Sequence, residues 1–183
     1  MNNDMLKSTL DEADCLIELS AIEQALDKMA EQLNQDYTSS SPVFLCVMNG
    51  GLVFSGHLLT RLNFPLEVAY CHATRYRGET SGRDIHWRVE PSVDLSGRHV
   101  IVVDDILDEG HTLIEIVKAC ENFGALSVKT AVLVDKQHDR KATENLVADY
   151  CELTVEDRYV FGFGMDYKHY WRNAPGIFAV KGM

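Results

Sequence analysis

The stretch from His99 to Leu113, HVIVVDDILDEGHTL, constrains the fold of this chain more than any other. Four apolar residues beginning at Val100 form a run typical of a strand buried on both faces. The adjacent acids Asp104 and Asp105 follow, and a glycine turn then leads into a helical apolar pattern. A strand that turns at glycine into a helix directs backbone N–H groups at one point, where the helix dipole is positive. The stretch therefore predicts a phosphate site with two carboxylates beside it.

Other strands and helices are expected to alternate with this unit. A capping box at Ser20–Glu23 predicts a helix that ends within 35–41, and a second helix is expected over 52–62. Further strands are predicted at 43–47, 66–71 and 128–134. Such alternation indicates an α/β fold with a mostly parallel sheet flanked by helices and a ligand site at the carboxyl ends of its strands. No repeat or linker divides the sequence, so residues 1–183 are expected to form one domain.

Charge and cysteine content narrow the class of protein. A net charge of −11 argues against a general electrostatic grip on nucleic acid or on anionic membranes. The first residues lack a basic-then-apolar signal pattern, and no apolar run approaches the length that spans a membrane. The five cysteines are odd in number and include no Cys-x-x-Cys pair, which is typical of reduced thiols. A cytoplasmic protein is therefore expected.

A long polar segment separates two of the predicted strands. Its part from Thr74 to Arg88 contains two glycines and four arginines and has little apolar periodicity. A segment of this length and composition is expected to be a mobile lid over an anionic substrate. A solvated hairpin remains the alternative.

The stretch from His99 to Leu113 resembles the motif by which type I phosphoribosyltransferases bind phosphoribosyl pyrophosphate (PRPP). Its apolar run, paired acids, third acid at Asp108, glycine at Gly110 and threonine at Thr112 are in the register of that motif. The resemblance extends from about Val43 to the end of the chain. It implies the type I phosphoribosyltransferase fold, with a small hood and a flexible lid loop.

Residues after the motif resemble the purine site of the members that salvage 6-oxopurines. They include Lys136, which ends a strand, and the later segments around Tyr159 and Asp166. A lysine can donate to the carbonyl at C6 of hypoxanthine or guanine, whereas adenine presents an amine there. The implied reaction transfers the 5-phosphoribosyl group from PRPP to hypoxanthine or guanine, giving IMP or GMP and pyrophosphate.

The resemblance also implies a role for each site residue. Asp108 is the expected general base for purine N7, Tyr76 the catalytic lid residue, and Arg172 a catalytic contact to pyrophosphate. Mg²⁺ is the expected cofactor. The other implied assignments are the ribose and Mg²⁺ for Asp104 and Asp105, Mg²⁺ for Asp166, the 5′-phosphate for the loop from Asp108 through Glu109, Gly110 and His111 to Thr112, the purine for Lys136, Tyr159, Val160 and Asp166, and pyrophosphate for Asn49 and Gly50 after a cis Met48–Asn49 peptide bond.

Some positions depart from the common pattern of the family. Asn49 replaces a frequent lysine, Arg75 stands beside Tyr76 where a serine is common, and the acidic Glu109 is expected to point away from the phosphate. Two alternatives therefore stay open: an enzyme that prefers xanthine, and a PRPP-sensing regulator built on the same fold. The resemblance also implies a homodimer or homotetramer.

Overall fold

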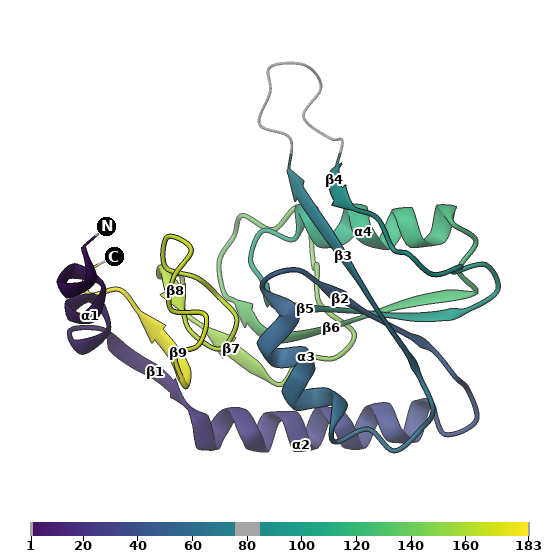
Figure 1. The fold of residues 1–183 in the computed structure, drawn as a ribbon, viewed down its shortest axis with the longest axis horizontal. Helices are drawn as coiled ribbons and strands as arrows, with labels where there is room; N and C mark the ends of the chain where they lie inside the picture. Colours follow the sequence, from purple (N-terminus) through teal and green to yellow (C-terminus); the bar gives the residue numbers. More distant parts are fainter. Residues whose placement is uncertain (1, 76–84, 183) are drawn as a thin grey trace.

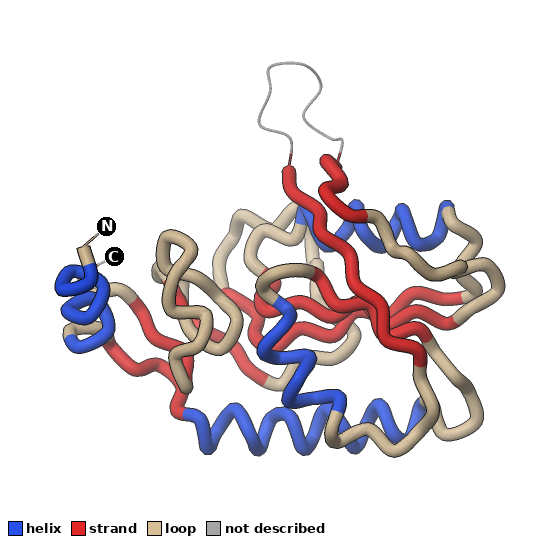
Figure 2. The backbone as a smooth tube through the Cα atoms, viewed as in Figure 1, coloured by secondary structure: helices blue, strands red, loops and turns tan. Residues whose placement is uncertain are grey.

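A computed structural model describes residues 2–75 and 85–182 of the chain, and backbone alone at Arg75 and Ile85. Its main element is a six-stranded sheet, in which all neighbouring strands are parallel except the antiparallel pair β3 and β4 (Figures 1 and 2). In spatial order the strands are β4 (Ile85–Val89), β3 (Glu67–Arg75), β2 (Val43–Val47), β5 (His99–Leu107), β6 (Ser127–Lys136) and β7 (Leu153–Val155). The predicted α/β class and mostly parallel sheet are confirmed.

Helices cover both faces of the sheet, with α2 and α4 on opposite sides in Figure 1. The helices of the sheet are α2 (Leu19–Asp36), α3 (Gly51–Leu59) and α4 (His111–Asn122). The alternation of side chains along β5 divides the core: Ile101 faces α2 and α3, whereas Val102 faces α4. Both are fully buried, as expected for a central parallel strand.

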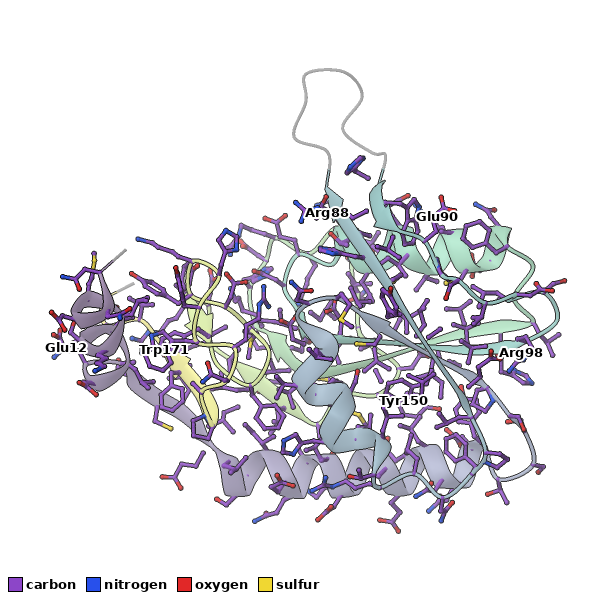
Figure 3. All side chains as sticks on the ribbon, in the orientation of Figure 1. Glu12, Arg88, Glu90, Arg98, Tyr150 and Trp171 are labelled. Atoms are coloured by element: carbon purple, nitrogen blue, oxygen red, sulfur yellow. The ribbon has the colours of Figure 1, made fainter. Side chains whose placement is uncertain are left out.

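A second, three-stranded sheet forms the hood of the molecule. We use this name for α1 (Asn3–Asp11), β1 (Asp14–Glu18), β8 (Val160–Phe161), β9 (Gly176–Ala179) and the loop 162–175. The strand β9 pairs antiparallel with both β1 and β8, so the two ends of the chain meet there (Figure 1). Figure 3 shows Trp171 beside α1, where its indole N–H donates to the Leu6 carbonyl at 2.7 Å.

Two predicted local features differ from the structure. The capping box is wrong, because β1 runs directly into α2: the helix begins at Leu19, Glu18 occupies the N-cap, and no side chain caps it. The long polar segment is not all irregular, since β3 continues to Arg75 and β4 pairs with it. The lid expectation falls mainly on residues 76–84, which lie outside the described residues. None of the described helices is long and apolar enough to cross a membrane.

Candidate functional site

A cleft of about 730 Å³ opens at the carboxyl ends of the parallel strands, between the main sheet and the hood. Every predicted site residue in the described part of the chain lines it. These are Asn49, Gly50, Asp104, Asp105, Asp108, Glu109, Gly110, His111, Thr112, Lys136, Tyr159, Val160, Asp166 and Arg172. The predicted lid residue Tyr76 lies outside the described residues, as does the side chain of Arg75.

The turn from β5 into α4 forms the floor of the cleft on one side. Gly110 is the N-cap of α4 and has φ +85°, a left-handed conformation that favours glycine. No side chain caps this helix, so the N–H groups of its first turn, near His111 and Thr112, remain available to a ligand in the cleft. Backbone donors and the positive end of a helix dipole are the features that bind a phosphate group.

Asp104 and Asp105 lie side by side at the end of β5. The backbone N–H of Asp105 donates to Asp104 Oδ1 at 2.9 Å. Burial raises the pKa of Asp104 well above its usual range, and the neighbouring Asp105 carboxylate raises that pKa further. Burial also raises the pKa of Asp105, although the nearby Arg172 opposes this shift. Ionisation of both carboxylates is therefore unfavourable, and a cation or a hydroxyl donor would stabilise their ionised forms.

The donor set of this pair fits Mg²⁺, which binds through one or two carboxylates together with substrate phosphates. Among residues 2–75 and 85–182, no three His, Cys, Asp or Glu side chains gather to hold a metal ion. Asp166 stands apart from the pair because its carboxylate accepts from Arg172 at 2.5 Å and from the His169 N–H at 2.7 Å. Arg172 also lies 3.8 Å from Asp105 Oδ2 and therefore bridges the two acidic positions.

The loop after β2 lies against the acidic pair. Its Met48–Asn49 peptide bond is cis, as the resemblance implied. A Cβ at Gly50 would overlap the Asp105 carboxylate, and a Cβ at Gly164 would overlap the Gly50 carbonyl. Glycine is therefore required where the loop, the end of β5 and the hood come together.

Asp108 makes two hydrogen bonds through its carboxylate. Lys136 Nζ donates to Oδ2 at 3.0 Å, and His138 Nε2 lies 2.7 Å from Oδ1. Burial acts to raise the pKa of Asp108, but the hydrogen bonds from Lys136 and His138 and the positive charge of Lys136 outweigh it and hold this pKa below the usual value. Asp108 is therefore ionised, in contrast to the buried pair.

The turn after β6 contacts the loop of residues 108–112, which we call the phosphate loop after its predicted role. Lys141 Nζ donates to the carbonyls of Leu107 and Asp108 at 2.7 and 2.8 Å and pairs with Asp135 at 2.5 Å. The Ala142 N–H donates to the Glu109 carbonyl at 2.8 Å. Sequence reasoning missed His138 and Lys141, although basic residues directly after β6 were a usable signal, because β5 and β6 end at the same edge of the sheet.

An aromatic side chain directly before β8 of the hood lines the cleft. The residue Tyr159 is 41% exposed, and its ring makes an edge-on contact with Tyr167 at 5.8 Å between centroids. The following residue, Val160, is buried in β8. A partly exposed aromatic ring that lines the cleft suits stacking against a flat ligand.

The fold and the cleft define an α/β protein in which a glycine turn opens a helix beside a carboxylate pair, at one edge of a parallel sheet. The phosphoribosyl transferase domain matches residues 14–169 of the sequence. The chain belongs to the phosphoribosyltransferase family, and its fold is the type I phosphoribosyltransferase fold.

Individual relatives cover most of the chain. A hypoxanthine-guanine-xanthine phosphoribosyltransferase from Tritrichomonas foetus is 33% identical over 87% of each chain. A hypoxanthine-guanine phosphoribosyltransferase from Streptococcus pneumoniae (strain ATCC BAA-255 / R6) is 32% identical over 91% of this chain and 92% of its own. The crystal structure of a hypoxanthine phosphoribosyltransferase from Staphylococcus aureus superposes with a TM-score of 0.87 at 24% identity, covering 99% of this chain and 96% of the other, which supports the fold.

Proposed function

We propose that this protein is a purine salvage enzyme that transfers the 5-phosphoribosyl group of PRPP to hypoxanthine or guanine, giving IMP or GMP and pyrophosphate. The observation that carries the proposal is the ion pair between Lys136 and Asp108, which lines the same cleft as the glycine turn into α4 and the partly exposed ring of Tyr159. The names of the Tritrichomonas foetus and Streptococcus pneumoniae relatives support the same reaction.

The phosphorylated sugar occupies the side of the cleft formed by β5 and α4. Backbone N–H groups from Asp108 to Thr112 and the Thr112 hydroxyl bind the 5′-phosphate, and Asp104 and Asp105 bind the ribose hydroxyls. Pyrophosphate lies between the loop of Asn49 and Gly50 and the guanidinium of Arg172. These contacts hold the leaving group and C1 of the sugar in one orientation for displacement.

The base occupies the hood side of the cleft. Tyr159 stacks on the purine, and backbone groups near Val160 and Asp166 bind its edge. Lys136 leaves Asp108 and donates to the carbonyl at C6, so an amine at C6 would face a buried donor. The other imidazole nitrogen of the purine, N9, forms the bond to C1 as the bond from C1 to pyrophosphate breaks. N7 then gives its proton to Asp108 and keeps the electron pair of the N–H bond, so the base is neutral in the product.

The carboxylates Asp104 and Asp105, with Asp166 nearby, would hold Mg²⁺ together with PRPP. When bound, the ion supplies positive charge that stabilises the leaving pyrophosphate. The raised pKa values of the carboxylate pair support this assignment, because a cation favours their ionised forms.

The whole chain is proposed to be one domain that acts as a homodimer or homotetramer in the cytoplasm. Five free cysteines support a reducing compartment. The outer face of β3 supports self-association, since its side chains Val68 and Tyr70 are 57% and 46% exposed. The alternate residues Ala69 and Cys71 point to the other face, where they are buried under α4. A second copy of the chain is the occupant we propose for this face.

The test is nucleotide formation from PRPP and Mg²⁺ with hypoxanthine, guanine, xanthine and adenine in parallel. Turnover of the first two without adenine is the expected result. Faster turnover of xanthine would favour the second candidate, which the name of the Tritrichomonas foetus relative supports. Binding of PRPP without turnover of any base would contradict the proposal and favour a PRPP-sensing regulator.

A further inference from the structure

His138 lies behind Asp108 rather than in the cleft. Its side chain is 2% exposed, whereas that of Asp108 is 45% exposed, and His138 is not among the residues that line the cleft. Its Nε2 lies 2.7 Å from Asp108 Oδ1, the oxygen that Lys136 does not contact. One side of the carboxylate is therefore bound by a buried imidazole and the other by a lysine that lines the cleft.

The backbone determines which ring nitrogen of this imidazole accepts a hydrogen bond. The Arg140 N–H donates to His138 Nδ1 at 3.0 Å, so Nδ1 must carry a lone pair. The proton of a neutral ring then sits on Nε2, from which it is donated to Asp108 Oδ1. A proton on Nδ1 would point at the Arg140 N–H and is incompatible with this hydrogen bond.

The turn that carries His138 is itself anchored. The Gln137 N–H donates to the Val155 carbonyl at 2.8 Å, which continues the pairing of β6 with β7. The Arg140 guanidinium binds both carboxylate oxygens of Asp157 at 2.7 and 2.8 Å. A two-pronged contact of this kind restricts the orientation of the turn as well as its position. The contacts of Gln137 and Arg140 thus fix the backbone that carries the imidazole.

We propose that His138 is a positioning residue for the proton-accepting carboxylate of Asp108, and that it acts as a neutral Nε2–H donor. The inference rests on the proposed function, in which Lys136 leaves Asp108 to bind the purine carbonyl. At that moment His138 keeps Oδ1 bound and the carboxylate oriented, while Oδ2 becomes free to accept the proton from N7. His138 keeps its own proton throughout.

A neutral donor suits this role better than a second cation. A charge fixed on Oδ1 would keep the pKa of Asp108 low after Lys136 had left, and a weaker base accepts a proton less readily. A hydrogen bond from a neutral ring orients the carboxylate and reduces its basicity less.

The first experiment is nuclear magnetic resonance of the imidazole nitrogens in the whole protein without substrates, with assignment by comparison with His138→Gln. We expect the His138 ring to give one protonated nitrogen, Nε2, and one unprotonated nitrogen, Nδ1, at neutral pH. A proton on Nδ1, or on both nitrogens, would overturn the assignment of the donor. This result does not depend on turnover, so it is separable from failure of the proposed function.

The second experiment compares steady-state rates of His138→Leu and His138→Gln with the unchanged protein. We expect kcat of the leucine variant to fall by about tenfold or more, because the Asp108 carboxylate is no longer held in orientation. The KM for PRPP should stay within about twofold, because the contacts to PRPP are kept. Glutamine carries an N–H₂ group close to the position of Nε2 and should restore most of kcat.

His99→Leu is the matched control, since this half-buried histidine is bonded to Ser127 Oγ at 2.7 Å at the opposite end of β5. It should leave kcat unchanged. Equal kcat for His138→Leu and the unchanged protein would refute a positioning role. So would a glutamine variant as slow as leucine while its melting temperature stays normal, because restored hydrogen bonding would then have no effect.

Discussion

At the scale of single residues, the site contains two kinds of carboxylate near the end of β5. The pKa of Asp104 is raised by burial and by Asp105, whereas the pKa of Asp108 is lowered overall by Lys136 and His138. Environments that separate the pKa values of neighbouring acids often mark their different tasks. In the proposed reaction, Asp108 is ready to accept a proton, and the paired acids become fully ionised when they bind a cation and the ribose.

Replacing Asp108 by asparagine tests the proton acceptor. We expect Asp108→Asn to lower kcat by about a hundredfold, since general base catalysis contributes on that order, while PRPP still binds. Steady-state rates and calorimetric titration with PRPP provide the measurement, and Asp94→Asn, at an exposed loop position, is the control. Unchanged turnover would remove Asp108 from this role.

The raised pKa of Asp104 has a consequence for stability. The unfolded chain releases this proton near pH 4, whereas the folded protein retains it to higher pH, so ionisation of Asp104 lowers the free energy of unfolding as pH rises above about 4. We expect Asp104→Asn to raise the melting temperature at pH 7 by at least about 2 °C, the shift that roughly 1 kcal/mol produces in a domain of this size.

Calorimetry at pH 4.5 and at pH 7, values chosen near and about three units above the unfolded pKa, should show a larger gain for Asp104→Asn at the higher pH. Activity should be lost in the same variant. Glu31→Gln, at an exposed position of α2, should change neither property. A melting temperature for Asp104→Asn equal to or below that of the unchanged protein would contradict the unfavourable charge inferred for the pair.

A substitution at Gly50 tests whether the close packing of this loop against Asp105 is required. Its φ of −60° is allowed for alanine, so Gly50→Ala should act by pushing its new Cβ into the Asp105 carboxylate. We expect a loss of about 1–3 kcal/mol in the free energy of unfolding, as crowding of a packed site produces, and a higher KM for PRPP. Gly56→Ala, in the same helix region with open space around it, should be neutral or stabilising by up to about 1 kcal/mol. Identical behaviour of the two variants would show that the contact is not restrictive.

At the scale of helices and strands, the sequence predicted the elements whose patterns are local. The apolar run at 100–103 and the glycine at 110 indicated β5 and the start of α4, and both are confirmed. The capping box failed because pairing of β1 with a distant strand fixes the chain just before Leu19. The edge strand β4 was missed because His86 and Arg88 give it a polar pattern. The hood was expected only from the resemblance, since β1 and β9 are far apart in sequence.

The turn after β6 is expected to stabilise the phosphate loop through Lys141. The side chain of Lys141 is 14% exposed and that of its partner Asp135 17%, so Lys141→Met leaves a largely buried carboxylate and two carbonyls without this donor. We expect a loss of about 3 kcal/mol in the free energy of unfolding and a higher KM for PRPP.

Denaturant unfolding and steady-state kinetics check this prediction. Lys118→Met removes an exposed ion pair with Glu115 on α4 and should cost less than about 1 kcal/mol. Adding Asp135→Asn to Lys141→Met should restore part of the stability, because the unpaired charge is removed. An equal loss in the free energy of unfolding for the two lysine variants would show that Lys141 does not stabilise the loop.

At the scale of the whole molecule, the outer face of β3 is the surface on which proposed self-association depends. Because α3 packs on β2 and β5, the face of β3 that carries Val68 and Tyr70 is left exposed beside it. We expect Val68→Asp to reduce the molar mass measured by light scattering after size-exclusion chromatography. Leu126→Asp, at a 65% exposed position between α4 and β6, is the control and should leave the mass unchanged. A wild-type mass equal to that of one chain would contradict the proposed oligomer.

The pairing of β1 with β9 has a consequence for the order in which the molecule is completed during translation. All strands of the main sheet leave the ribosome before β9, so a nascent chain can assemble that sheet while β1 still lacks its partner. Tyr159 directly precedes β8, which pairs with β9 as well, and the Tyr159 carbonyl accepts from the Val180 N–H at 2.9 Å just after β9. A chain interrupted before Gly176 would therefore keep the sugar-phosphate half of the cleft and lack a fixed wall for the base.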